Sequence, residues 1–259
     1  MGTADFWAGK KFPNLPTFFG KYKNPIGIEI EVEQAPVFET KPIFWVRDKD
    51  GSLKIDGAEF ISVPLSGRCI DYALAEIYPL ISQQDCLWSH RTSIHVHLNV
   101  NTFTVKKVKT LIALYACLEE LFFFFVDDLR KGNNYCYPLT DLNPESLMLG
   151  MPEQKYCAFN VGNALEEHNT VEFRHMHGTG NIKSIRRWIQ LIVKLHHYVD
   201  KTPCDQIRQR IKTLNYVSEY NQFISEIFGV TAKFFDKLNL QQMMEENVFW
   251  AKLYLIFGK

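Results

Sequence analysis

The chain carries no excess of charge of either sign. Its 259 residues contain 29 lysines and arginines and 29 aspartates and glutamates, so the formal net charge at pH 7 is zero. Without a net field, the chain as a whole has no electrostatic attraction for nucleic acid or for an anionic membrane surface. We therefore expect no nucleic-acid partner, and only a local basic patch would change that expectation.

The cysteines lack any paired spacing. Six are scattered along the chain, at Cys69, Cys86, Cys117, Cys136, Cys157 and Cys204, with no C-x-x-C pair. The N-terminal residues also show no signal-peptide pattern. This usage favours reduced thiols in a cytoplasmic protein and argues against structural zinc.

Long hydrophobic runs are also missing. The most apolar stretch, LIALYACLEELFFFFV from Leu111 to Val126, contains Glu119 and Glu120. It is shorter than the roughly 20 residues that a membrane span needs. We predict a buried helix here, with no membrane span and no membrane partner.

The chain does have enough apolar residues for a large core. Hydrophobic residues make up 46% of it and aromatic residues 14%, which predicts one large domain or one domain with a smaller helical part. We expect an irregular N-terminal arm over 1–25, a main domain over 26–200 and a helical extension over 201–259. Neutral charge and abundant aromatics permit self-association without requiring it.

Hydrophobic periodicity predicts alternating strands and helices. Expected strands cover 26–33, 43–47, 59–63, 92–100, 156–161 and 170–175; expected helices cover 69–81, 104–130 and 182–199, with several short helices after Pro203. The segment 131–155 is rich in Gly, Asn and Pro, which is typical of a binding loop or lid.

Three of the expected strands carry polar groups on one face. In TSIHVHLNV, residues 92–100, strict alternation places His95, His97 and Asn99 opposite the aliphatic residues. In the same way, GIEIEVE aligns Glu29, Glu31 and Glu33, and TVEFRH aligns Glu172 with Arg174. Each pattern alone also fits a solvated strand face or a surface ion pair.

The order of these segments resembles a known family. Gly27-x-Glu29-x-Glu31 is followed by an acidic segment with Asp50, Ser52, Glu59 and Ser62, then by His95-x-His97, and last by Glu172-x-Arg174 with Gly178-Thr179. This order, from about Ile26 to Trp188, is similar to that of the amidoligases in the carboxylate-amine ligase superfamily of glutamine synthetase and glutamate-cysteine ligase. The resemblance implies an α+β fold, in which a curved antiparallel sheet backed by helices forms a nucleotide cup.

The resemblance also implies roles for individual residues. It assigns ATP and Mg²⁺, with Mn²⁺ as an alternative ion, and the metal ligands would be Glu29, Glu31, Glu59, His95 and Glu172. His97 would contact the ATP phosphates, and Arg174 would face the transferred phosphoryl group, with Glu31 and Glu172 completing the catalytic set. We consider Asn160 and Lys155 as nucleotide or substrate contacts, or else as polar residues of a turn and strand edge.

The implied activity is ATP-dependent joining of a carboxylate to an amine through an acyl phosphate. Small-molecule or peptide carboxylates and amines would be the partners, but the chain does not identify the acid or the amine. One departure is His177, which precedes Gly178-Thr179 where the family often has an acidic residue. The alternatives are a metal-dependent hydrolase that uses the histidines and glutamates, and a non-catalytic binding protein of the same fold.

Overall fold

The computed structural model of the chain describes residues 25–145, 156–162, 169–229 and 239–258. Within these ranges the strands are β1 (Ile26–Val32), β2 (Trp45–Asp48), β3 (Ala58–Ser62), β4 (Ser93–Asn99), β5 (Phe159–Asn160) and β6 (Thr170–His177). The α-helices are α2 (Arg68–Ile81), α3 (Val105–Ala116), α4 (Glu119–Phe124), α7 (Ile182–Lys201), α8 (Cys204–Thr213), α9 (Val217–Phe228) and α10 (Leu240–Phe257). The chain also forms two short 3₁₀ helices, η2 (Asp128–Arg130) and η3 (Leu139–Asp141).

The strands form one antiparallel sheet that is not closed into a barrel. Its six strands follow the order β2-β3-β1-β4-β6-β5, and every neighbouring pair is antiparallel. With seven α-helices among the described residues, the fold belongs to the mixed α+β class, as expected. None of the described helices is long and apolar enough to cross a membrane.

The described residues separate into two compact units. The first contains the whole sheet, α2, η2 and α7 as far as Ile189. The second contains α3, α4, η3, the rest of α7 and the three C-terminal helices. The two compact units do not meet at residue 200, because residues 103–125 and 138–145 group with the C-terminal helices. The expected boundaries at residues 25 and 200 stay predictions.

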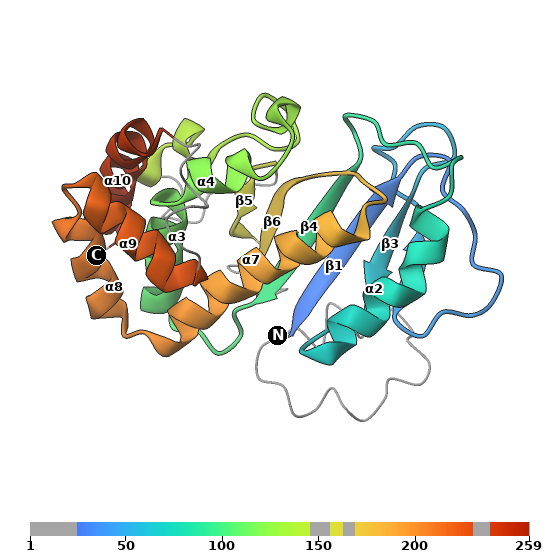
Figure 1. Cartoon of the computed structure of the whole chain (residues 1–259), viewed down its shortest axis with the longest axis horizontal. Helices are drawn as coiled ribbons and strands as arrows, with labels where there is room; N and C mark the ends of the chain where they lie inside the picture. Colours follow the sequence, from blue (N-terminus) through green and yellow to red (C-terminus); the bar gives the residue numbers. More distant parts are fainter. Residues whose placement is uncertain (1–24, 146–155, 163–168, 230–238, 259) are drawn as a thin grey trace. The chain divides into compact units, whose positions relative to one another are not determined.

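Alternation along the strands produces the core of the first unit. One sheet face is aliphatic and aromatic, and its fully buried members include Ile28, Ile30, Phe60, Val96, Leu98, Val171 and Phe173. Helix α2 covers this face, where the Trp45 Nε1–H donates to the Ala73 carbonyl at 2.7 Å. The start of α7 covers it too, through a tilted ring contact between Trp188 and His175 with centroids 5.4 Å apart, and Figure 1 shows both helices in front of the strands.

Three predicted elements differ from the structure. The helix expected over 104–130 is divided into α3, α4 and η2, and no Gly or Pro in that stretch signals the break. The strand expected over 156–161 is reduced to β5, because only Phe159 and Asn160 pair with β6. The C-terminal helices are not all short, since α10 has 18 residues.

Candidate functional site

Strand register brings the predicted polar residues onto the sheet face opposite α2 and α7. Glu29 of β1 lies directly across from His95 of β4. His97 of β4 lies across from Glu172 of β6, and Glu172 lies across from Asn160 of β5. Directly opposed residues in an antiparallel sheet share a face and have Cβ atoms about 5 Å apart. Side chains separated by more than 140 residues in the chain therefore meet.

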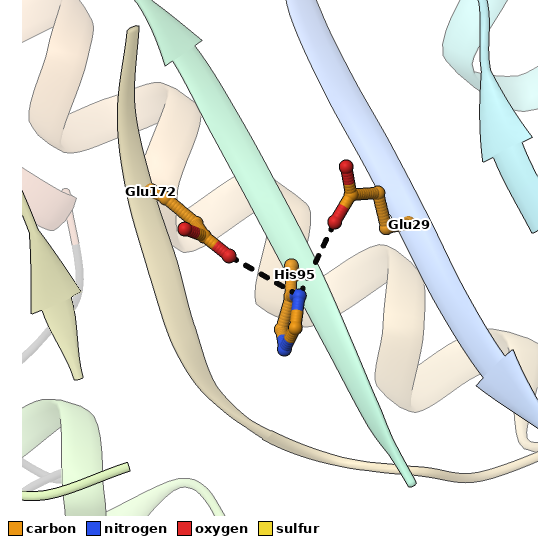
Figure 2. A group of neighbouring side chains, drawn as sticks. All are labelled: Glu29, His95 and Glu172. Atoms are coloured by element: carbon orange, nitrogen blue, oxygen red, sulfur yellow. Dashed lines mark hydrogen bonds and ion pairs between the residues drawn. The ribbon is translucent and has the colours of Figure 1, made fainter. Parts of the chain in front are cut away.

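Glu29, His95 and Glu172 form a compact set of metal-ligand atoms. The His95 Nδ1 atom lies 3.3 Å from Glu29 Oε2 and 3.2 Å from Glu172 Oε1. One ligand atom from each residue lies within 4.8 Å of the other two. Figure 2 shows the three side chains converging from three neighbouring strands. Two carboxylates and one imidazole nitrogen suit a divalent cation such as Mg²⁺ or Mn²⁺, so these residues fit the ion that the resemblance implies.

Arg174 adds a positive charge beside this set. Its Nη1 atom lies 2.5 Å from Glu172 Oε1, and its Nε–H donates to the Tyr135 carbonyl at 3.3 Å. Burial opposes the charge of Arg174, but the carboxylates, Glu172 first, raise its pKa above the ordinary value. The site therefore combines an acidic set with a fixed guanidinium.

His97 is a second cationic group in the site. Its Nε2 atom lies 3.2 Å from Glu29 Oε1 and 3.9 Å from Glu172 Oε1. Burial alone would favour the neutral ring, but the Glu29 and Glu172 carboxylates raise the pKa of His97 to about 9. A protonated imidazole at neutral pH suits contact with an anionic ligand.

The same contacts keep two glutamates ionised. Burial opposes the charge of Glu29, yet His97 and His95 hold the pKa of that carboxyl well below its ordinary value. Burial likewise opposes the charge of Glu172, and Arg174 followed by the histidines lowers its pKa. Ionised carboxylates are the form that binds a metal cation.

Glu31 lies outside the three-residue set but connects to it through Ser93. The Ser93 hydroxyl donates to Glu31 Oε2 at 2.5 Å, and the same Oγ lies 2.7 Å from His95 Nε2. The direct distance from Glu31 Oε1 to His95 Nε2 is longer, at 3.9 Å. Burial raises the pKa of Glu31. Ser93 was not among the predicted site residues, although its place two residues before His95 puts it on the same strand face.

Glu59 continues an acidic row away from Glu31. The register pairs Glu31 of β1 with Glu59 of β3, and Glu59 with Asp48 of β2. Like charges directly opposite each other on a sheet are destabilising, so this row favours a nearby cation. Glu59 does not belong to the set formed by Glu29, His95 and Glu172.

Of the two polar residues considered as contacts, one lies in the site. Asn160 Nδ2 donates to Glu172 Oε2 at 2.9 Å, while its Oδ1 accepts the Gly162 backbone N–H at 2.9 Å. Asn160 therefore holds the carboxylate of Glu172 in place. Lys155 lies outside the described residues.

Arg130 is a second residue that the sequence did not indicate. It is 2% exposed, and it donates from Nε to the His175 carbonyl at 3.0 Å and from Nη2 to the Arg174 carbonyl at 2.6 Å. Burial lowers its pKa. These carbonyls belong to a β-bulge, where His95 of β4 faces both Arg174 and His175 of β6. Arg130 thus supports the strand segment that carries Arg174.

His177 lies at the end of β6, opposite Ser93. Its Nδ1 accepts the Asp127 backbone N–H at 3.2 Å, which links β6 to the turn before η2. Burial lowers the pKa of His177 and so favours the neutral ring. This geometry gives His177 a structural contact. The lid expected over 131–155 stays a prediction, because residues 146–155 lie outside the described ranges.

No protein-family model, no curated protein and no solved structure matches the chain.

Proposed function

We propose that this protein is an ATP- and Mg²⁺-dependent carboxylate-amine ligase that forms an amide or isopeptide bond. The observation that supports it most strongly is the convergence of Glu29, His95 and Glu172 on one sheet face with Arg174 beside them. The acidic donors suit a metal ion, and the guanidinium suits the charge of a phosphoryl group. The open antiparallel sheet would then serve as the nucleotide cup.

Each side chain has a role in this proposal. Glu29, Glu172 and His95 Nδ1 would hold one Mg²⁺, and the opposed Glu31 and Glu59 would hold a further ion. Bound Mg²⁺ would supply neutralisation of the phosphate charges during transfer. His97, whose Nε2 atom lies beside Glu29 and Glu172, would contact the ATP phosphates.

The reaction has two steps. An oxygen of the substrate carboxylate attacks the γ-phosphorus of ATP, the bond to the bridging oxygen breaks, and ADP leaves. The amine nitrogen then attacks the acyl carbon, loses a proton and expels phosphate. Arg174 would stabilise the charge that spreads over the transferring oxygens in the first step. Its guanidinium would be oriented by Glu172, whose carboxylate is in turn held by Asn160.

The function is tested by calorimetry and by a release assay. ATP should bind in the presence of Mg²⁺ and much more weakly after chelation, because the acidic site needs a cation before it accepts phosphates. Amino acids, short peptides and polyamines should then be screened for ADP production. Undetectable binding at millimolar ATP would refute the ligase.

A matched pair of variants connects the assay to the site. Glu29→Gln removes one metal ligand and should abolish ADP production, while Glu39→Gln changes an exposed carboxylate outside the site and should not. Hydrolysis of amides or esters without nucleotide would instead favour the metal-dependent hydrolase. Binding of ATP without turnover of any acid and amine pair would favour a non-catalytic binding protein.

A further inference from the structure

Ser93 makes two hydrogen bonds whose directions depend on each other. Its side chain is 3% exposed, and its Oγ lies 2.5 Å from Glu31 Oε2 and 2.7 Å from His95 Nε2. A hydroxyl has one proton to donate and two lone pairs with which to accept. The three groups therefore form one chain, and the direction of one hydrogen bond sets the direction of the other.

The metal-bound state selects one direction for this chain. A metal ion held at Nδ1 leaves Nε2 as the nitrogen that carries the proton of a neutral imidazole, and Ser93 Oγ lies within hydrogen-bond distance of that nitrogen. The Ser93 oxygen then accepts from His95 Nε2–H, so the Ser93 proton points to Glu31. A neutral imidazole protonated at Nε2 has its lone pair on Nδ1, the atom that faces Glu29 and Glu172.

We infer that Ser93 is a positioning residue that holds His95 in the tautomer with Nδ1 available to the metal ion, and that it connects this ion to Glu31. The inference rests on the proposed function, because it presumes that Glu29, His95 and Glu172 bind a divalent cation. Outer-shell partners of ligating histidines typically contribute about 10–100-fold to metal affinity. Ser93 should contribute in the same range.

A threonine and valine pair isolates the hydroxyl. Ser93→Thr keeps the hydroxyl, whereas Ser93→Val replaces it with a methyl group of similar shape, and both residues suit a strand. Mn²⁺ binding, measured from the electron paramagnetic resonance signal of the free ion without nucleotide, should be weakened about 10–100-fold in Ser93→Val relative to Ser93→Thr. Equal affinities in the two variants would overturn the inference.

Thr92 is the control for simple loss of a buried hydroxyl. Its Oγ1 donates to the Ser89 carbonyl at 2.9 Å, and it takes no part in the set formed by Glu29, His95 and Glu172. Thr92→Val should therefore lower thermal stability without changing Mn²⁺ affinity. A similar loss of affinity in Thr92→Val would show that the effect is structural and would overturn the inference.

A measurement on the unaltered chain covers the case in which the variants fail to fold. Long-range ¹H–¹⁵N spectra distinguish Nδ1–H from Nε2–H, and with Mg²⁺ bound His95 should be protonated on Nε2 only. A proton on Nδ1 in that state would overturn the role of Ser93 but not the ligase. Failure of the unaltered chain to bind Mn²⁺ or Mg²⁺ would instead overturn both proposals, so the two failures are distinguishable.

Discussion

Arg174 Nη1 and Glu172 Oε1 lie 2.5 Å apart, and the two residues are two positions apart on the same strand. Side chains two apart share a strand face, and here 12% of the Arg174 side chain and 4% of the Glu172 side chain are exposed, so the pair is largely buried. Removing one partner of a buried pair leaves the other charge without compensation, which typically costs about 3–5 kcal/mol. A test of Arg174 therefore needs a variant that keeps its charge.

Arg174→Lys is that variant. Lysine keeps the positive charge but loses the planar fork that reaches both Glu172 and the Tyr135 carbonyl. If Arg174 stabilises the transferring phosphoryl group, ADP production should fall by roughly 10²–10³-fold. Mn²⁺ affinity should change little, and thermal melting will show whether the variant is folded. Turnover close to that of the unaltered chain would rule out the assigned role.

Glu29 and Glu59 provide a comparison between two carboxylates on the same sheet face. Glu29→Gln removes a member of the compact set. Loss of an outer-shell partner typically lowers metal affinity about 10–100-fold, and loss of a ligand such as Glu29 should lower the Mn²⁺ affinity of this site by at least as much. Glu59→Gln should change the Mn²⁺ affinity of that site by no more than a few-fold and should lower only the number of ions bound. A titration that follows both affinity and stoichiometry distinguishes them. Equal effects of the two substitutions would contradict the separation into two acidic sites.

Glu119, in the second unit, predicts a specific pH dependence. The fully buried carboxyl accepts hydrogen bonds from the Leu139 N–H at 2.6 Å, the Thr140 N–H at 3.2 Å and the Tyr115 hydroxyl at 2.9 Å. Burial raises the pKa of Glu119 from 4.5 to about 7. The native state thus retains a proton that the unfolded chain releases above pH 4.5. The contribution of Glu119 to stability is highest below pH 4.5 and declines as the pH rises to about 7, by about 3 kcal/mol.

Glu119→Gln should remove this decline, because glutamine imitates the protonated acid at every pH. Denaturant unfolding of both proteins between pH 4 and pH 8 measures the difference in free energy. The variant should gain stability relative to the unaltered chain as the pH rises. A pH-independent difference would show that Glu119 titrates normally.

Substitution of Gly178 tests whether the chain requires a residue without a side chain before Thr179. A Cβ atom on this residue would overlap the Thr92 side chain and would lie 2.8 Å from the Trp88 ring. Gly178→Ala should therefore destabilise the chain by about 1–3 kcal/mol, as overpacking usually does. Gly51→Ala is the control, since a Cβ atom there meets nothing within 4 Å, and its free energy of unfolding should change far less.

The sequence by itself determined which side chains share a face. A strand has a period of two residues, so the alternation in TSIHVHLNV placed His95 and His97 together on one side, and the alternation around Glu172 did the same for Arg174. This local property does not depend on the neighbouring strands. The α+β class with an antiparallel sheet was also predicted correctly, through the family resemblance.

Only the tertiary structure decided which residues meet. Glu29 and Glu31 look equivalent in GIEIEVE, yet the register of β1 against β4 puts Glu29 opposite His95 and leaves Glu31 to reach it through Ser93. Register arises from pairing between distant segments, and a shift of one residue would turn every side chain to the other face. Arg130 was missed for the same reason, because its contacts with the bulge in β6 span more than 40 residues of chain.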